Sequence, residues 1–160
     1  MEVYLFRHGI AEDAKPGSPD ANRALTEEGK KKVAEVVKAA RRAGTEPSLI
    51  ISSPWLRAVE TAQLAVEGFD FKGEVVRTER LVPHGSPEKV WDELRDYRDE
   101  SAILLAGHEP LLGRLAAYLL SSPALRIEMK KAAMVRIDIE TFGAAPHGIL
   151  RWMFTAKLCK

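Results

Sequence analysis

The chain has 160 residues, of which 46% are hydrophobic and 29% charged, so it is long enough for one domain with a core and too short for two. Its 24 Lys and Arg residues nearly balance its 23 Asp and Glu residues, and the formal net charge of +1 provides no overall field that would attract nucleic acid or an anionic membrane. No apolar run approaches the length of a membrane span, and the chain begins with a strand pattern instead of a signal segment. The single cysteine, Cys159, can form neither an internal disulfide nor a zinc site. We therefore expect one cytoplasmic domain over residues 1–160.

The first predicted element is a buried strand that ends in polar residues. Residues 3–6 form an apolar run, and Arg7, His8 and Gly9 follow it directly. In a mostly parallel sheet, ligands bind beyond the carboxyl ends of the strands. Neighbouring strand residues point to opposite faces, so Arg7 and His8 can reach one ligand only if the chain bends, and Gly9 is expected to supply that bend.

A surface loop and an amphipathic helix are predicted next. Residues 10–24 are rich in Pro, Gly, Asp and Ser, which indicates a loop beside the strand end and a candidate substrate-facing flap. Its acids Glu12 and Asp13 either contact substrate or keep the loop soluble. Thr26 is the predicted N-cap of the helix, whose lysine run at 30–32 is interpreted as a solvated face and not as a nucleic-acid site.

The second predicted strand covers residues 49–51 and leads directly into a helix start. Ser53 as N-cap and Pro54 at the first helical position predict a helix that continues to about Val66. Arg57 then lies one turn inside the helix, near a strand end and a helix N-terminus that both favour an anion. On this local pattern alone, an ordinary exposed surface arginine is an equally good interpretation.

Two further strands complete the parallel part of the sheet. Residues 74–76 predict a short third strand, which is followed by a turn and by a helix that begins at Ser86. Residues 102–106 give the clearest strand pattern in the sequence, and His108 follows it just before an apolar helix over residues 111–120. His108 is therefore predicted at a strand end, as His8 is.

The hydrophobic period changes in the last part of the chain. Apolar and charged residues alternate over residues 133–140, which predicts a half-exposed antiparallel edge strand. A turn around Gly143 leads to a last predicted strand over residues 149–154.

Three strand ends thus carry two arginines and two histidines, and βα connections bring them to one edge of a parallel sheet. The four residues are Arg7, His8, Arg57 and His108. Guanidinium groups match phosphate oxygens bidentately and can follow charge as it spreads over a phosphoryl group in the transition state. We therefore expect a phosphoryl-binding site that uses no metal and no cofactor. A metal site is a weaker interpretation because no His, Asp and Glu set has ligand spacing.

In combination, these motifs resemble the histidine phosphatase superfamily, which has the phosphoglycerate-mutase-like fold. The segments that carry the resemblance are Arg-His-Gly at 7–9, Leu-Thr-Glu-Glu-Gly at 25–29, Ser-Pro-Trp-Leu-Arg-Ala-Val-Glu-Thr-Ala at 53–62, Leu-x-Pro-x-Gly at 81–85 and Gly-His-Glu-Pro at 107–110. The short chain and the last two segments are most similar to the small SixA-type phosphohistidine phosphatases. The resemblance implies a three-layer α/β/α sandwich with a mixed, mostly parallel central sheet.

The resemblance also implies a role for each of the four site residues. His8 would attack phosphorus in line and become a transient phosphohistidine, which requires a neutral ring with one bare nitrogen. Arg7 and Arg57 would bind the phosphoryl oxygens. His108 would donate to the same oxygens, and we expect it to be protonated in so anionic a site. Water would then release phosphate.

One departure from the superfamily concerns the acid that protonates the leaving group. The larger phosphomonoesterases and mutases place a carboxylic acid after the third strand, whereas this chain has the turn at residues 81–85, with Glu79 just upstream. An alkoxide needs a proton far more than imidazole does, because imidazole has a conjugate acid near neutral pH. The missing acid therefore favours phosphohistidine as the substrate.

Three other residues, His84, Glu109 and His147, carry side chains that could act in a site of this kind. His84 is a candidate acid in the turn at 81–85, although a partly exposed turn histidine is the simpler interpretation. Glu109 either orients His108 or binds water, but an acid in the first turn of a helix also explains it. His147 lies in a late loop and is expected to be inert.

The leading hypothesis is a metal-independent phosphatase of signal transduction that acts on phosphohistidine in a phosphocarrier or phosphotransfer protein. A small domain with little loop material leaves a pocket open to a protein-borne phosphate. The alternatives are a phosphatase of small phosphate esters, a mutase, and a non-catalytic phosphate-binding module. The module would need only the arginines, so the presence of both His8 and His108 argues against it. No nucleic acid or membrane partner is expected.

Overall fold

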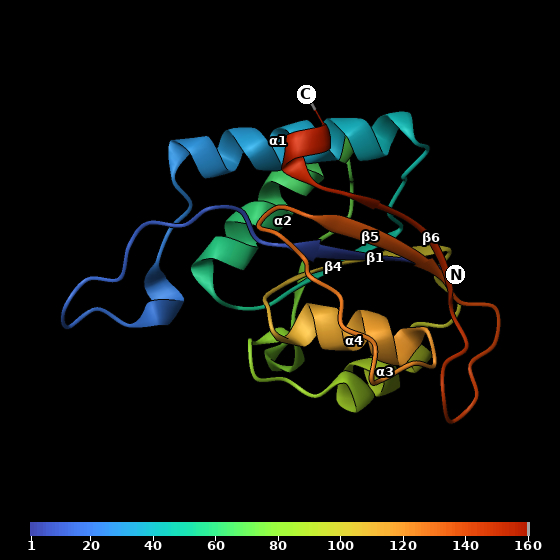
Figure 1. Ribbon diagram of the computed structural model, residues 1–160. Helices are drawn as coiled ribbons and strands as arrows, with labels where there is room; N and C mark the ends of the chain where they lie inside the picture. The colour runs from blue at the N-terminus through green and yellow to red at the C-terminus, as the bar shows by residue number, and fades with distance from the viewer. Residues whose placement is uncertain (160) are drawn as a thin grey trace.

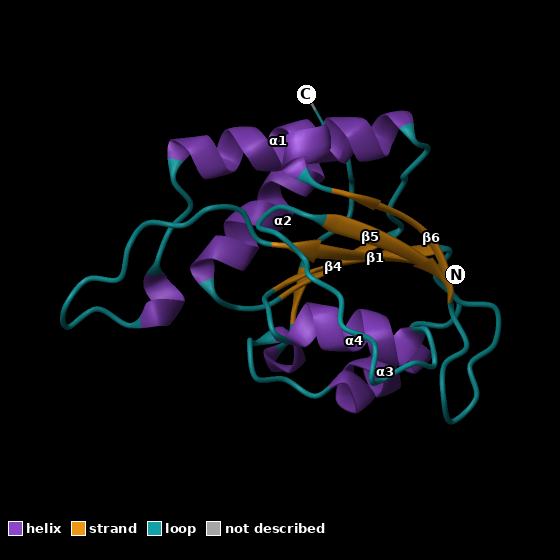
Figure 2. Cartoon of the chain, viewed as in Figure 1, coloured by secondary structure: helices purple, strands orange, loops and turns teal. Residues whose placement is uncertain are grey.

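A six-stranded mixed sheet lies between two pairs of helices in the computed structural model, which describes residues 1–159 (Figures 1 and 2). The strands are β1 (Glu2–Arg7), β2 (Leu49–Ser52), β3 (Val76–Arg77), β4 (Ala102–Gly107), β5 (Met134–Asp138) and β6 (Ile149–Phe154). The helices are α1 (Glu27–Arg42), α2 (Leu56–Phe69), α3 (Pro87–Asp96) and α4 (Leu111–Leu119), with 3₁₀ turns η1 (Asp20–Asn22), η2 (Glu79–Leu81) and η3 (Ala156–Leu158). The strand order is β3-β2-β4-β1-β5-β6, in which β3, β2, β4 and β1 are parallel and β5 is antiparallel to both of its neighbours.

The sheet is covered on both faces, which explains the unbroken apolar run of the first strand. Val3 and Leu5 pack into the core beneath α3 and α4, whereas Tyr4 and Phe6 pack into the core beneath α1 and α2. A strand that is buried on both faces has no solvent-facing positions, so it contains no alternating polar residues. The predicted three-layer α/β/α sandwich is confirmed.

Helix starts agree with the sequence at three of four positions, and one of these is α4, which begins at Leu111 as predicted. Thr26 Oγ1 accepts from the Gly29 N–H at 2.9 Å, and Ser86 caps α3, as predicted. The predicted cap at Ser53 is wrong, because α2 begins at Leu56 with Trp55 as its N-cap. The Ser53 hydroxyl accepts from the Trp55 N–H at 3.3 Å and also lies 2.8 Å from a ring nitrogen of His108, so it connects the chain before α2 to the end of β4.

The position of β5 also differs from the prediction. It was expected at the edge of the sheet, but it lies between β1 and β6, and β6 is the edge strand. The charged residues that suggested exposure pair with one another: Arg136 Nε lies 2.8 Å from Asp138 Oδ1, and Arg136 Nη2 lies 2.9 Å from Glu2 Oε1. One ion pair within β5 and one to β1 therefore gave an internal strand the sequence pattern of an edge strand.

Strand β3 pairs only with β2 and starts later than the predicted third strand over residues 74–76. It is two residues long and forms the other edge of the sheet. Within residues 1–159, no helix combines the length and the apolar composition that a membrane span requires.

Candidate active site

The carboxyl ends of β1, β4 and β2 are adjacent, and each is followed by a polar residue of the site. In the register of the sheet, Arg7 lies opposite Gly107. The backbone N–H of His8 donates to the Gly107 carbonyl at 3.0 Å, and that of Ser53 donates to the Ala106 carbonyl at 2.9 Å. The pairing of the three strands thus continues one residue past their ends and fixes where each site segment leaves the sheet.

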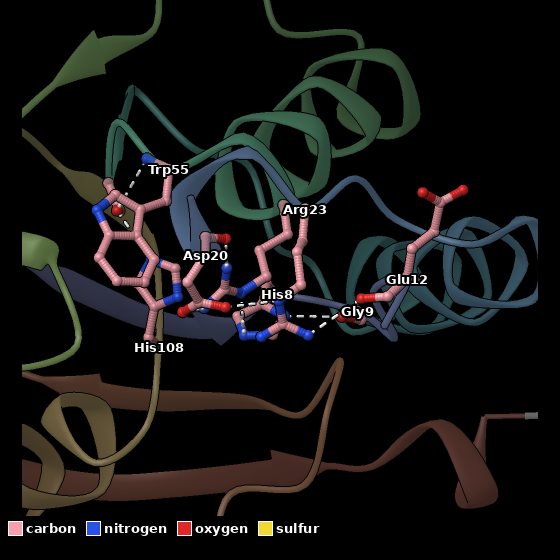
Figure 3. Close-up of polar contacts among 9 residues, drawn as sticks. His8, Gly9, Glu12, Asp20, Arg23, Trp55 and His108 are labelled. Atoms are coloured by element: carbon pink, nitrogen blue, oxygen red, sulfur yellow. Dashed lines mark hydrogen bonds and ion pairs between the residues drawn. The ribbon is translucent and has the colours of Figure 1, made fainter. Parts of the chain in front are cut away.

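His8 and His108 face each other at this edge, as the sequence predicted from two separate strand ends (Figure 3). Their ring centroids are 5.1 Å apart, and both side chains are buried. The structure therefore brings together residues that are a hundred positions apart in the chain.

His8 is held in a single tautomer by its two neighbours. Its Nδ1 lies 2.7 Å from the Gly9 carbonyl oxygen, which can only accept, so Nδ1 carries the proton. Its Nε2 accepts from Arg57 Nε at 3.3 Å, so the Nε2 lone pair faces the guanidinium. Burial lowers the pKa of His8 to about 4. The hydrogen bond to Gly9 raises this pKa, and the positive charges of Arg57 and Arg7 lower it further. At neutral pH the ring is neutral, with Nε2 bare.

Gly9 is required by close packing and not by an unusual backbone bend. Its φ is outside the left-handed region, so the turn at this position does not depend on a conformation that only glycine adopts readily. A Cβ at this position would lie 2.7 Å from Val33 Cγ2 and 3.0 Å from the Gly29 carbonyl oxygen, both on α1. The Gly9 N–H also donates to Thr61 Oγ1 at 3.2 Å, and Thr61 in turn donates to the Arg57 carbonyl. The turn that carries His8 is thereby held between α1 and α2.

Arg57 is a buried site residue and not an exposed surface arginine, since only 4% of it is accessible. Its Nε points to His8, whereas Nη1 donates to the Asp20 carbonyl at 2.8 Å and Nη2 lies 3.2 Å from Asp20 Oδ2. The guanidinium also lies 4.9 Å from the centre of the Trp55 ring. Contacts on two edges and one face hold the planar group in one orientation. Burial lowers the pKa of Arg57, and the Asp20 carboxylate opposes that effect.

Asp20 brings the loop of residues 10–24 to the site, a contact that the sequence analysis did not predict. Asp20 lies in η1, and its other carboxylate oxygen, Oδ1, accepts from Arg23 Nε at 2.6 Å. Arg23 also donates to the Glu12 carbonyl oxygen, while the carboxylates of Glu12 and Asp13 are exposed and form no ion pair within residues 1–159. Nothing local distinguishes Asp20 from Asp13 in the sequence, because the contact depends on the position of α2.

His108 is almost fully buried at the end of β4, with 1% of its surface accessible. Its Nε2 lies 2.8 Å from Ser53 Oγ, and its Nδ1 has no hydrogen-bond partner within the described chain. Burial lowers the pKa of His108 to about 3, with contributions from His8 and Arg57. Without a bound anion, burial and the neighbouring cations thus favour the neutral His108 ring, and its protonation beside a bound phosphoryl group stays a prediction.

Arg7 is fixed by a carbonyl from a distant segment. Its Nη1 donates to the Met129 carbonyl at 2.7 Å, and its Nε is buried without a partner in residues 1–159. Burial lowers the pKa of Arg7, and the charges of Glu109 and Glu128 oppose this. Arg7 in turn contributes to the lowered pKa values of both histidines of the site.

The remaining candidates lie outside this cluster. Glu109 Oε1 accepts from the Gly113 N–H at 2.6 Å, so it caps the first turn of α4 and forms no hydrogen bond with His108 in the described residues. His84 and Glu79 are exposed, and neither forms a side-chain hydrogen bond or ion pair within residues 1–159. His147 Nδ1 lies 3.1 Å from Ser121 Oγ. His147 precedes β6 and therefore lies at the end of the sheet that is opposite the carboxyl ends of β1, β2 and β4.

No group of three or more His, Cys, Asp or Glu side chains with the geometry of a metal site occurs in the part of the chain that the structure describes. The arrangement at the strand ends consists instead of two guanidinium groups, one bare imidazole nitrogen and a second imidazole. Chemically, it can bind an anion with several oxygens and bring a neutral nucleophile to its centre.

Comparisons with known proteins agree with this arrangement. The model of the histidine phosphatase superfamily (branch 1) matches residues 3–82. An uncharacterised protein of Picosynechococcus sp. is 32% identical over 139 residues, which cover 84% of this chain and 83% of that protein. The structure of the protein histidine phosphatase SixA in complex with tungstate has a TM-score of 0.89 and 23% identity and covers 100% of both chains. The alpha-ribazole phosphatase from Shigella flexneri has a TM-score of 0.75 and 18% identity and covers 98% of this chain and 97% of its own.

Proposed function

The chain belongs to the histidine phosphatase superfamily, and we propose that it hydrolyses phosphohistidine on a phosphocarrier or phosphotransfer protein with His8 as its nucleophile. The observation that carries this proposal is the state of the His8 ring. Its Nδ1 proton is bound to the Gly9 carbonyl, and its bare Nε2 lies beside the guanidinium of Arg57. A nucleophile that is neutral, oriented and adjacent to a cation matches the requirements of attack on a phosphoryl group.

In the first step, the Nε2 lone pair of His8 forms a bond to phosphorus while the bond from phosphorus to the leaving nitrogen breaks. Arg57 and Arg7 bind the equatorial oxygens and neutralise the charge that they carry. A metal ion is not required for this neutralisation. The electron pair of the broken bond goes to the substrate imidazole, which leaves as a neutral ring if it has already been protonated.

In the second step, water attacks the phosphorus of phospho-His8, the His8 electron pair returns to Nε2, and both water protons leave on the product as dihydrogen phosphate. The proton on Nδ1 stays bound to Gly9 throughout, so the ring keeps its tautomer for the next cycle. The two arginines retain their charge in both steps, because a guanidinium is not deprotonated at any working pH. Phosphate is the product.

The choice of phosphohistidine rests on the leaving group. Neither Glu79 nor His84 is bonded into the site, and Glu109 is engaged in capping α4. An imidazole can leave without a dedicated acid, whereas an alkoxide cannot leave easily. The fold similarity to a SixA that is named as a protein histidine phosphatase supports the same class. The fold similarity to an alpha-ribazole phosphatase supports a small phosphate ester as the alternative substrate.

The deciding experiment measures phosphate release in EDTA, at matched concentrations, from a phosphohistidine-bearing carrier protein and from an aryl phosphate. A strong preference for the carrier protein is expected. Faster release from the ester would mean that another group supplies a proton, and the small-molecule phosphatase would replace the proposal. Activity that EDTA abolishes would contradict the metal-independent mechanism.

A further inference from the structure

The buried pair formed by Ser53 and His108 determines where the second histidine keeps its proton. Ser53 Oγ lies 2.8 Å from His108 Nε2, and the two residues have 0% and 1% of their surfaces accessible. One of the two atoms must donate to the other. The ring is neutral, since burial and the neighbouring cations hold the pKa of His108 near 3. Only one ring nitrogen therefore carries a proton, and either nitrogen is chemically able to do so.

The surroundings of the serine hydroxyl decide between the two tautomers. Ser53 Oγ accepts from the Trp55 N–H at 3.3 Å, and within residues 1–159 its only other polar contact is His108 Nε2. If Nε2 donated to the hydroxyl, the hydroxyl proton would be buried without an acceptor. A buried donor that loses its partner is a cost that folded proteins generally avoid. If the hydroxyl donates to Nε2, every hydrogen-bonding group of Ser53 Oγ is used.

We propose that Ser53 is a positioning residue, whose hydroxyl donates to Nε2 of His108 and so keeps the His108 proton on Nδ1. Nδ1 is the ring nitrogen that has no partner in the described residues. The His108 ring faces His8 across a centroid distance of 5.1 Å (Figure 3). The nitrogen left without a partner is therefore an N–H donor, on a ring that lies next to the His8 ring.

This proton position has a consequence that rests on the proposed function. Because Nε2 is engaged by Ser53, a neutral His108 can donate to a phosphoryl oxygen only through Nδ1, and only if Nδ1 carries the proton; a bare Nδ1 would present a lone pair to the anion. Because Ser53 keeps the proton on Nδ1, His108 can donate to a phosphoryl oxygen without being positively charged. Both histidines then hold their protons on Nδ1. In His8, the Gly9 carbonyl accepts the Nδ1 proton directly; in His108, Ser53 donates to Nε2 and thereby leaves the proton on Nδ1.

Nitrogen-15 NMR of the histidine side chains tests the tautomer without any assumption about activity. In the wild-type chain at pH 7, the His108 signals, identified by their loss in His108→Asn, are expected to show a protonated Nδ1 and a bare Nε2. In Ser53→Ala, Nε2 loses its donor, and the proton is expected to move wholly or partly to Nε2. A wild-type Nε2–H tautomer would overturn the proposal even if the Ser53→Ala chain did not fold. An unchanged tautomer in a folded Ser53→Ala chain would also overturn it.

Binding of inorganic phosphate, measured by calorimetry, tests the consequence for the site. Ser53→Ala is expected to weaken binding about tenfold, as for the loss of one well-placed donor. The matched control is Ser52→Ala, because Ser52 is equally buried but donates to the Ser53 carbonyl and not to a histidine. The control is expected to bind within about twofold of the wild type. Equal losses in both variants would show a general structural effect and would reject a role for Ser53 through His108. If the NMR result holds but the chain releases no phosphate from any substrate, the proposed function fails and the tautomer assignment stands.

Discussion

The ends of the central strands and the turn at residues 81–85 each carry a candidate histidine, yet the surroundings of these histidines differ in almost every physical respect. At the ends of β1, β2 and β4, the two histidines and Arg57 are buried, and each is oriented by hydrogen bonds. In the turn at residues 81–85, His84 is exposed and forms no side-chain hydrogen bond within the described chain. The central strands end next to one another, whereas the turn follows β3, a two-residue strand at the edge of the sheet.

This difference indicates what the site is equipped to do. The buried cluster can hold negative charge and present a neutral imidazole nitrogen, because its arginines are fixed and its histidines have low pKa values. The exposed turn has no fixed group that could protonate a leaving oxygen. The contrast therefore favours a substrate whose leaving group needs no enzymatic acid. Four experiments test this difference between the buried cluster and the turn.

The largest effect is expected from His8→Ala, which removes the bare nitrogen at the centre of the buried cluster. Phosphate release should fall by about 10³-fold or more, because the covalent step has no substitute. Steady-state phosphate release from phosphohistidine carrier protein measures this. The matched control is His147→Ala, an exposed histidine at the opposite end of the sheet, which should retain full activity. Full activity in His8→Ala would disprove the mechanism.

Arg57→Lys tests whether the oriented guanidinium, and not only its charge, matters in the buried cluster. Lysine keeps the positive charge but cannot contact His8 and both acceptors of Asp20 with one planar group. We expect kcat to fall about 10²-fold, as for the loss of a preorganised charge-stabilising group. Full activity of the lysine variant would mean that charge alone is sufficient.

The pH dependence of stability tests the claim that the His8 ring is neutral and buried. The pKa is about 4 in the folded chain and 6.5 in the reference state, so the unfolded chain binds more protons between these values. Stability is therefore complete above about pH 6.5 and falls as the pH drops toward 4, by on the order of 3 kcal/mol for this residue. Urea unfolding from pH 7.5 to 4 measures the slope. His8→Asn should reduce the slope and leave the part that comes from His108, whose pKa is also low, whereas His147→Asn should not change it. A wild-type curve without a slope would contradict the low pKa of His8.

The smallest effect is expected from His84→Gln in the exposed turn. Because the side chain contacts nothing in the described site, phosphate release from phosphohistidine should remain within about twofold of the wild type. The same variant should be tested on an aryl phosphate. A loss on the ester alone would identify His84 as a leaving-group acid for esters, and a loss on both substrates would remove the distinction between the buried cluster and the turn.

Much of the fold, and the placement of Arg7, His8, Arg57 and His108 at or near neighbouring strand ends, could be predicted from the sequence. Each of the three apolar runs specifies a strand end, and each is followed within a few residues by a candidate: Arg7 and His8, Arg57, or His108. Parallel strands with helical connections bring such ends to one edge of the sheet. The caps at Thr26 and Ser86 were also predictable. In each case the signal lies within a few residues along the chain, because hydrophobic period and capping are local properties.

Other features were decided only when distant segments came together. Asp20 contacts Arg57 across 37 positions, Ser53 contacts His108 across 55, and the Met129 carbonyl contacts Arg7 across 122. No local pattern distinguishes these partners from other aspartates, serines or carbonyls. The low pKa of His108 was missed for the same reason, since it depends on burial and on cations from other elements.

The sequence by itself determined the layered α/β architecture and the identities of the groups at the strand ends, because both follow from periodicity and from chain order. The tertiary structure decided the orientation of Arg57, the tautomer of His8 and the low proton affinity of both buried histidines. Orientation and proton affinity depend on distances, burial and hydrogen-bond partners in three dimensions. These quantities exist only once the strands and helices have packed together.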